Sequence, residues 1–369
     1  HMAQEIPERN RLLVNVNLAM ETRGEERTAE VRQGLALTMV SLLAAFMLIP
    51  NISAYLQFNL AVERDAIGTL YLVGGLFSSF GMRFDDRVTG NLDVFGIDAA
   101  VIHVEIDPSE IDKNVKTSVA INADTGEVLN LLSRDPEIVS RPRRIWFEQI
   151  DAYRSEIREA IQEEIETGIG REGQLLMKSI VTQLSDLTEG KDIIVADVGQ
   201  HQMILARFYN FQTANSWFTS GGAGTMGCAL PMAIGIKLAR PDERVWSVSG
   251  DGGFQMNIQE LGAIMEHGVD VKILLMNNGY LGMVRQWQTL FYDGRYAGTP
   301  MKNPDFGAIA GAYRIPYLQV TELDQVADAI KTAAEHEGAF MVEFLCDPSE
   351  IILPMVPAGG GIADMIVSR

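Results

Sequence analysis

Short apolar runs of strand length alternate with longer stretches of helical pattern along most of the chain. The clearest runs occupy residues 100–107, 193–198, 245–249 and 271–276. Between the last two runs, Asn257 and Glu260 have the spacing of a capping box, and Gly268 follows the end of a helical pattern. A strand, a helix and a second strand in this order are typical of a parallel sheet covered by helices. The pattern therefore predicts an α/β fold with doubly wound parallel sheets.

The same pattern divides the chain into three segments. Residues 1–69 contain no recognisable motif and stay unassigned, although their charged and apolar stretches favour helices. Residues 70–140 form a partial middle domain. A polar, proline-containing stretch at 133–144 is expected to be a linker, and residues 141–369 form the last domain.

Composition restricts the class of protein and its partners. The chain has 369 residues and 47% hydrophobic content, enough for two or three domains with substantial cores. Its formal net charge of −19 argues against nucleic acid, which proteins bind through surplus Lys and Arg. The apolar run at 35–49 is shorter than the ~20 residues that span a bilayer, so no membrane partner is expected. Cys228 and Cys346 match no metal spacing and suit a reducing compartment, so we expect a cytoplasmic protein.

Polar side chains follow two of the predicted strands at the point where each strand ends. Asp251 lies in the turn Gly250-Asp251-Gly252-Gly253 after the first strand, and Asn278 follows the second. Because parallel strands carry their carboxyl ends to one edge of a sheet, we expect the two side chains to lie close together. A carboxylate oxygen and an amide oxygen suit a small hard cation that also holds phosphate, and the glycines allow phosphate to approach the backbone.

The spacing of these residues resembles the signature of thiamine diphosphate enzymes. A glycine–aspartate–glycine turn is followed by the 24 residues 253–276 and then by the Asn277-Asn278 pair. In the signature, the aspartate, the second asparagine and a backbone carbonyl two residues further on bind Mg²⁺ against the diphosphate of the cofactor. The resemblance therefore implies that Asp251, Asn278 and the carbonyl of Tyr280 are metal ligands.

Further segments narrow the resemblance to one family. Residues 220–227 (SGGAGTMG) and 282–287 (GMVRQW) resemble the cofactor domain of acetolactate synthases, and residues 353–359 (LPMVPAG) resemble their carboxyl-terminal segment. The resemblance implies decarboxylation of pyruvate and its condensation with a second 2-ketoacid in branched-chain amino acid biosynthesis. It also implies thiamine diphosphate and Mg²⁺ as cofactors and a homo-oligomer, and it leaves a regulatory subunit open.

Individual site residues follow from the same resemblance. The implied cofactor contacts in the last domain are Gly199, Gln200, His201, Gly224, Gly252, Gly253 and Gly282. By the same resemblance, Met226 supports the bent conformation of the cofactor, Met283 borders its thiazolium ring, and Trp287 favours 2-ketobutyrate as the acceptor. From the residues alone, such a methionine could equally fill a core, and an isolated tryptophan or histidine is more often structural.

The middle segment resembles the domain in which acetolactate synthases bind FAD. The resemblance rests on residues 81–90 (GMRFDDRVTG) and 101–115 (VIHVEIDPSEIDKNV), and a strand is expected before them at 70–73. The implied flavin contacts are Arg83, Asp85, Arg87, Glu105, Ile106 and Asp124, and Arg87 is also a candidate catalytic residue. The alternative is that residues 85–87 form an exposed, ion-paired turn of little energetic weight.

One catalytic residue that the resemblance implies, a glutamate, has no recognisable counterpart in this sequence. The family also needs a glutamate from the pyrimidine-binding domain of a neighbouring subunit, and no glutamate in residues 3–69 has the small apolar context that this role requires. Three functions therefore stay open. They are an acetolactate synthase subunit that depends on a partner for the glutamate, a cofactor-binding module without turnover, and another thiamine diphosphate decarboxylase or lyase.

Overall fold

A computed structural model describes residues 76–96, 99–134 and 144–366 of the chain. The chain divides into two compact units, which are considered separately. Unit 1 comprises His1–Arg158 and Leu353–Arg369, and unit 2 comprises Glu159–Ile352. The helices expected in residues 1–69, the strand expected at 70–73 and most of the expected linker lie outside the described residues.

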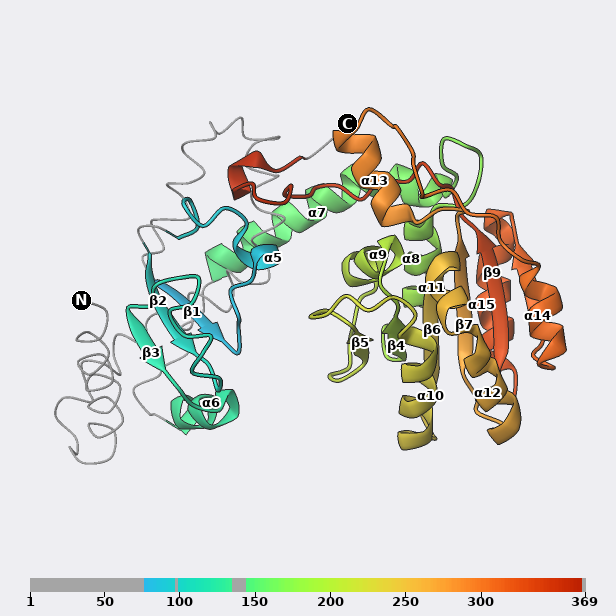
Figure 1. The fold of residues 1–369 in the computed structure, drawn as a ribbon, viewed down its shortest axis with the longest axis horizontal. Helices are drawn as coiled ribbons and strands as arrows, with labels where there is room; N and C mark the ends of the chain where they lie inside the picture. Colours follow the sequence, from blue (N-terminus) through green and yellow to red (C-terminus); the bar gives the residue numbers. More distant parts are fainter. Residues whose placement is uncertain (1–75, 97–98, 135–143, 367–369) are drawn as a thin grey trace. The chain divides into compact units, whose positions relative to one another are not determined.

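Unit 2 is built on a six-stranded sheet in which every paired strand is parallel to its neighbour. The strand order is β5-β4-β6-β7-β9-β8 (Figure 1). The strands are β4 (Ile193–Ala196), β5 (Trp217–Thr219), β6 (Val245–Gly250), β7 (Lys272–Asn277), β8 (Tyr317–Val320) and β9 (Phe340–Leu345). The apolar runs that predicted strands at 193–198, 245–249 and 271–276 correspond to the adjacent strands β4, β6 and β7.

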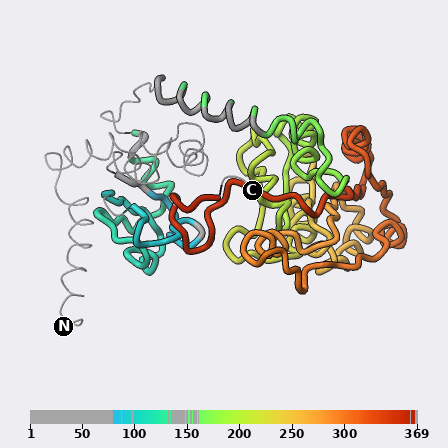
Figure 2. Tube along the Cα trace, turned by 90° about the horizontal axis from the view of Figure 1, so that it is seen from above, coloured from blue at the N-terminus to red at the C-terminus, as the bar shows by residue number. Residues whose placement is uncertain are grey.

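Helices cover both faces of this sheet. One face carries α8 (Met177–Leu187), α9 (Gln200–Phe208) and α15 (Leu323–Glu335). The other face carries α10 (Ala229–Ala239), α12 (Leu261–His267) and α14 (Phe306–Ala312). Seen from above, the green segment of α8 and the red-orange segment of α15 lie side by side (Figure 2). The predicted α/β fold with parallel sheets is confirmed.

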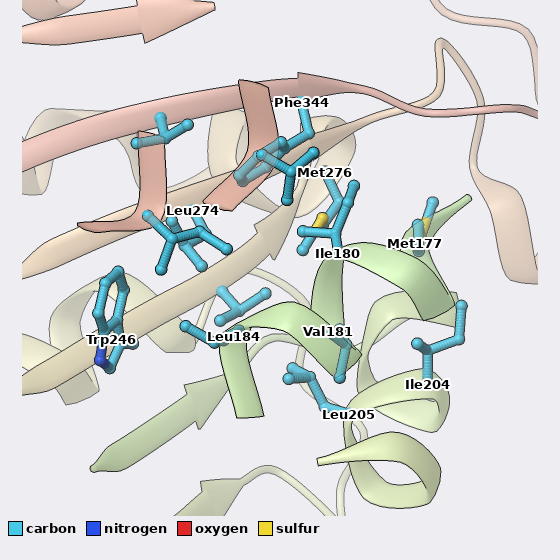
Figure 3. Close-up of a cluster of buried hydrophobic side chains, with 14 of the residues drawn as sticks. Met177, Ile180, Val181, Leu184, Ile204, Leu205, Trp246, Leu274, Met276 and Phe344 are labelled. Carbon is cyan, nitrogen blue, oxygen red and sulfur yellow. The ribbon is translucent and has the colours of Figure 1, made fainter. Parts of the chain in front are cut away.

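The core of unit 2 is divided by the sheet into two buried clusters. Along β7, Leu274 and Met276 point to the side of α8, and Figure 3 shows them packed against side chains of α8 and α9. The alternate residues Ile273 and Leu275 belong to the cluster on the other face. This alternation follows from strand geometry, in which successive side chains point to opposite faces. Because both faces of β7 are buried, its residues from Ile273 to Met276 form a continuous apolar run instead of alternating with polar residues.

The segment after β6 differs from the sequence prediction. A short helix, α11 (Asp251–Met256), starts directly at Asp251, and a 3₁₀ turn, η1 (Ile258–Glu260), precedes α12. Asn257 makes no capping bond at η1: its Oδ1 atom accepts from the side-chain amide of Gln259, and its Nδ2 atom donates to the carbonyl of Gly227. The predicted capping box is therefore wrong. The predicted helix end is confirmed, since Gly268 has the left-handed conformation that terminates α12.

The chain reverses direction across the sheet between β4 and β6. From β4 the chain passes through α9 to β5 on one side, whereas from β6 it passes through α12 to β7 on the other side. The carboxyl ends of β4 and β6 therefore flank a topological switch point. In open parallel sheets, ligands bind in the crevice at this place.

The described part of unit 1 is a smaller parallel sheet in the order β1-β2-β3. Its strands are β1 (Leu76–Phe80), β2 (Ala100–Val104) and β3 (Val119–Ile121), and its helical elements are α5 (Asp86–Thr89), α6 (Thr125–Arg134) and η2 (Ile362–Asp364). Helix α7 (Arg144–Thr167) contributes residues to both units. Among the residues that the structure describes, no helix is long and apolar enough to cross a membrane.

Candidate cofactor and metal site

The carboxylate of Asp251 is buried at the carboxyl end of β6. Only 1% of the residue is exposed, and burial raises the pKa of the carboxyl group. Its Oδ2 atom accepts hydrogen bonds from the backbone amide of Gly279 at 2.9 Å and from Nδ2 of Asn303 at 2.7 Å. No Lys or Arg in the described part of the chain forms an ion pair with it. A buried carboxylate with neutral partners is stabilised by a cation.

The bond to Gly279 brings the turn after β7 against Asp251, as the parallel pairing of β6 and β7 predicts. Asn278 is buried in this turn, and its Oδ1 atom accepts from the amide of Tyr280 at 3.1 Å. A β-bridge pairs Tyr280 with Pro300 and uses the carbonyl of Gly279 and the amide of Leu281, not the Tyr280 carbonyl. The three predicted metal ligands thus lie in two adjoining segments.

Three of the predicted glycines lie where polypeptide segments pack closely. A Cβ atom on Gly253 would lie 2.0 Å from Oδ2 of Asp197, and one on Gly282 would lie 2.2 Å from Oε1 of Gln200. A Cβ atom on Gly252 would lie 2.8 Å from the Leu281 side chain. These contacts are shorter than side chains tolerate, so the absence of a Cβ lets the ends of β4, β6 and β7 approach one another.

The end of β4 contributes Gly199, Gln200 and His201. His201 is buried, and its ring lies against Gly250, where an added Cβ atom would be 3.1 Å from Nδ1. Burial lowers the pKa of His201 to about 4, so the ring is neutral near pH 7. Its Nε2 atom has no hydrogen-bond partner in the described part of the chain. The Gln200 amide instead donates to Oε1 of Gln286 and to the carbonyl of Glu350, each at 3.0 Å.

Asp197 is a site residue that sequence reasoning missed. It follows β4 directly and is fully buried, and burial raises the pKa of its carboxyl group. Its Oδ1 atom accepts from the amides of Val198 and Gly227, whereas Oδ2 has no partner among the described residues. An acidic residue at the carboxyl end of an apolar strand was the available signal.

The loop between β5 and α10 carries Gly224 and Met226. Gly224 and Gly227 have φ angles of 64° and 86°, in the left-handed region that favours glycine. The amide of Gly227 donates to Asp197, which ties this loop to the end of β4. Met226 is half-buried and belongs to neither of the two buried clusters of unit 2.

The helix expected after the metal turn is present as α13 (Gly282–Phe291). Met283 and Trp287 are both half-buried, and the rings of Trp287 and Phe291 lie 5.3 Å apart. An open hollow of about 570 Å³ lies beside the helix. Its lining residues are Val284, Trp287, Gln288, Tyr292 and Arg295. Trp287 thus borders a space that a small molecule could enter.

The predicted flavin residues of unit 1 surround the strand ends of the small sheet. Arg83 and Asp85 form an exposed ion pair at 3.2 Å. Asp85 and Asp124 accept backbone amides at the starts of α5 and α6. Glu105 is buried and accepts the amide of Asp107.

The two remaining flavin candidates lie beside these residues. Ile106 follows β2 and is 67% exposed. Arg87 lies in α5.

Comparisons with known proteins agree with this geometry. Residues 197–344 match the family described as "Thiamine pyrophosphate enzyme, C-terminal TPP binding domain", and residues 76–132 match "Thiamine pyrophosphate enzyme, central domain". The acetolactate synthase large subunit of Corynebacterium glutamicum is 39% identical over 313 residues, which are 81% of this chain and 49% of that protein.

Two further relatives show the same pattern of coverage. The chloroplastic acetolactate synthase of Arabidopsis thaliana is 37% identical over 79% of this chain and 44% of that protein. The acetolactate synthase isozyme 3 large subunit of Escherichia coli is 35% identical over 84% of this chain and 56% of that protein. The chain is a homologue of acetolactate synthase large subunits. It spans about half the length of the curated relatives it matches.

The site residues fit the cofactor and metal that these thiamine pyrophosphate domains imply. Asp251 supplies a buried carboxylate without a basic partner in the described residues, and Asn278 supplies an amide oxygen from the adjoining turn. Oxygen ligands of this kind suit Mg²⁺. Among the residues that the structure describes, no group of three or more His, Cys, Asp or Glu side chains could hold a metal ion.

Proposed function

We propose that the chain is a catalytic subunit of acetolactate synthase, which decarboxylates pyruvate and joins the remaining two-carbon unit to a second 2-ketoacid. The observation that carries the proposal is the bond between the Gly279 amide and the buried Asp251 carboxylate, which brings the Asn278 turn to the switch point of the sheet. The homology to acetolactate synthase large subunits supports it.

The proposed roles follow the chemistry of each side chain. Asp251, Asn278 and the Tyr280 carbonyl hold Mg²⁺, and Gly199, Gln200 and His201 bind the diphosphate. The Nε2 atom of His201 has no partner in the described chain, and the ring is neutral at pH 7, so it is available for a ligand. Thiamine diphosphate, when bound, supplies the electron sink that decarboxylation requires.

The remaining proposed roles concern the reacting end of the cofactor and the acceptor. Met226 and Met283 support the thiazolium ring, and Trp287 selects 2-ketobutyrate or pyruvate as the acceptor. The hollow beside Trp287 supports this role. FAD is proposed for the strand ends of unit 1, at Arg83, Asp85, Arg87, Glu105, Ile106 and Asp124, where the exposed Ile106 offers an apolar contact.

The proposal also covers the quaternary structure and the cellular location of the protein. We infer a homo-oligomer, because the half-buried Met226 and Met283 lie at the candidate cofactor site and a second subunit would cover the apolar surface around them. We also infer a cytoplasmic location, because Cys228 and Cys346 are free thiols, which suit a reducing compartment. A regulatory subunit is compatible with the relatives that are named large subunits. The domain limits 70–140 and 141–369 stay predictions.

Calorimetric titration of thiamine diphosphate with and without Mg²⁺ tests the binding site. We expect Mg²⁺-dependent binding to wild-type protein and its loss in Asp251→Ala, with the far-UV spectrum unchanged. Equal affinity in both proteins would refute the proposed site.

The products formed from pyruvate test the reaction. Acetolactate supports the proposed activity, whereas acetaldehyde alone would favour a simple decarboxylase. Cofactor binding with no product would favour a binding module without turnover, because general acid–base help from the pyrimidine-side glutamate is worth on the order of 10²–10⁴ in rate.

A further inference from the structure

The side chain of Asn303 joins the two segments that carry the candidate metal ligands. It lies in the loop between α13 and α14, and its Nδ2 atom donates to Oδ2 of Asp251 at 2.7 Å and to Oδ1 of Asn277 at 2.8 Å. Its own Oδ1 atom accepts from Nε2 of Gln255 in α11 at 3.0 Å. One amide therefore contacts the ends of β6 and β7 at the same time.

Asn277 is held from its other side by a buried carboxylate. Its Nδ2 atom donates to Oε1 of Glu343 in the interior of β9. Only 3% of Glu343 is exposed, and its Oε2 atom accepts from the hydroxyl of Tyr317 and from Nε2 of Gln319, both on β8. A continuous line of hydrogen bonds thus runs from Asp251 through two asparagines to the far edge of the sheet.

Two donors on one oxygen determine how the Asp251 carboxylate is oriented. The Gly279 amide and the Asn303 amide both reach Oδ2, so rotation of the carboxylate would break two hydrogen bonds to a buried anion. Hydrogen bonds to charged groups are stronger than those between neutral groups. The direction of the remaining lone pairs is therefore set before a cation arrives.

Asn303 also brings no charge to the site. A second carboxylate would repel Asp251, and a Lys or Arg would occupy the position of a cation, whereas an amide donates a hydrogen bond to the carboxylate without neutralising it. The charge of Glu343 lies behind the turn and has only neutral partners among the described residues. Among the described residues, neither Asn303 nor the side chains bonded to Glu343 bring a positive charge to the site.

We propose that Asn303 is a positioning residue for the divalent cation: it fixes the Asp251 carboxylate and the turn at Asn277, while Glu343 anchors that turn from the opposite side. The inference rests on the proposed function, since the cation is the Mg²⁺ that accompanies thiamine diphosphate. Partners that orient a metal ligand typically change metal affinity 10–100-fold when they are removed.

The test measures the Mg²⁺ concentration that gives half-maximal binding of thiamine diphosphate at fixed, saturating cofactor, followed by calorimetry. Asn303→Ala is expected to raise this concentration about 10–100-fold. Asn114→Ala is the matched control, because it also removes a side-chain amide that bridges two segments, here by a bond to the carbonyl of Phe84, but it belongs to unit 1 and not to the line of hydrogen bonds that ends at Asp251. We expect this control to stay within about 3-fold of wild type, well below the effect of removing a ligand's own partner.

A second substitution at Asn303 and a measurement of thermal stability separate a role in metal binding from a purely structural role. Asn303→Ser retains a small polar side chain that is too short to bridge Asp251 and Asn277, and we expect it to weaken Mg²⁺ dependence in the same direction as Asn303→Ala. Thermal unfolding without Mg²⁺ reports any purely structural loss. A variant that is folded and has the wild-type Mg²⁺ requirement would overturn the inference, and so would weaker cofactor binding with an unchanged Mg²⁺ requirement.

Failure of the proposed function has a different signature. If wild-type protein bound no thiamine diphosphate at any Mg²⁺ concentration, the proposed function would be wrong and the role of Asn303 would fall with it. If wild-type protein bound the cofactor in the presence of Mg²⁺ and the Asn303 variants had the same Mg²⁺ requirement as wild type, the proposed function would stand and only the role of Asn303 would be wrong.

Discussion

Gln200 at the start of α9 donates a hydrogen bond to Gln286 in the middle of α13 at 3.0 Å, although the two residues belong to different helices on either side of the metal turn. Oε1 of Gln286 also accepts the amide of Ile352, and its Nε2 atom donates to the Ile352 carbonyl. Two hydrogen bonds therefore hold Ile352, the last residue of unit 2, against α13, the helix that carries Met283 and Trp287.

Replacement of Gln286 by alanine should destabilise the protein. The residue is 3% exposed, so the amides of Gln200 and Ile352 would lose a partner that water cannot easily replace. We expect a loss of about 2–4 kcal/mol in the free energy of unfolding, measured by chemical denaturation, because each buried unsatisfied group costs about 1–3 kcal/mol. Gln288→Ala is the control on the same helix, since Gln288 bonds the 297–299 turn where water has access. A comparable loss in the control would contradict this explanation.

The stability contribution of Glu350 should depend on pH. Its carboxylate is buried and accepts the amides of Met177 and Lys178 at the start of α8, with Nζ of Lys178 at 3.9 Å and Asp347 nearby. Burial raises the pKa of Glu350 to about 7 from an ordinary value of 4.5. Between these two values the folded protein binds the proton more tightly than the unfolded chain, so this contribution to stability falls as pH rises.

Glu350→Gln removes this titration and provides the measurement. Relative to wild type, the variant should gain about 1–3 kcal/mol in free energy of unfolding between about pH 5 and pH 7.5, the range that a shift of this size allows. Glu164→Gln is the control, because Glu164 also pairs with Lys178 but its side chain is 62% exposed. Parallel pH profiles for wild type and Glu350→Gln would show that the group titrates alike in both states.

Two glycine-to-alanine substitutions should have opposite effects. In Gly253→Ala the new Cβ atom would lie 2.0 Å from Oδ2 of Asp197, so α11 must move away from β4, and we expect destabilisation of about 1–3 kcal/mol. Gly235→Ala lies in α10, where an added Cβ atom meets nothing within 4 Å. The higher helix propensity of alanine should then stabilise the protein by about 0.5–1 kcal/mol. Thermal or denaturant unfolding of both variants checks the prediction, and a neutral Gly253→Ala would refute the packing argument.

The candidate metal site could be predicted because its signals are local. Asp251 and Asn278 each follow an apolar run directly, and parallel pairing of consecutive strands brings their segments together without any knowledge of the rest of the fold. The end of α12 at Gly268 was predictable for the same reason, because a left-handed glycine acts within one turn of the helix. The capping box failed because the Oδ1 atom of Asn257 accepts from the Gln259 side chain, while its Nδ2 atom reaches the carbonyl of Gly227, which lies 30 residues away and outside any local pattern.

The sequence alone therefore determined the class of fold, the central strands and the segments that carry the candidate cofactor site, since all of these depend on periodicity and on residues next to strand ends. Only the tertiary structure decided which side chains hold that site in place. Asn303, Glu343 and Gln286 act across separations of 24 to 86 residues from the partners discussed here, through hydrogen bonds such as Asn303 to Asp251 and Gln286 to Gln200. No local sequence pattern marks these three residues. They hold the candidate site in place only because the strand order β4-β6-β7-β9-β8 brings distant strand ends to one edge of the sheet.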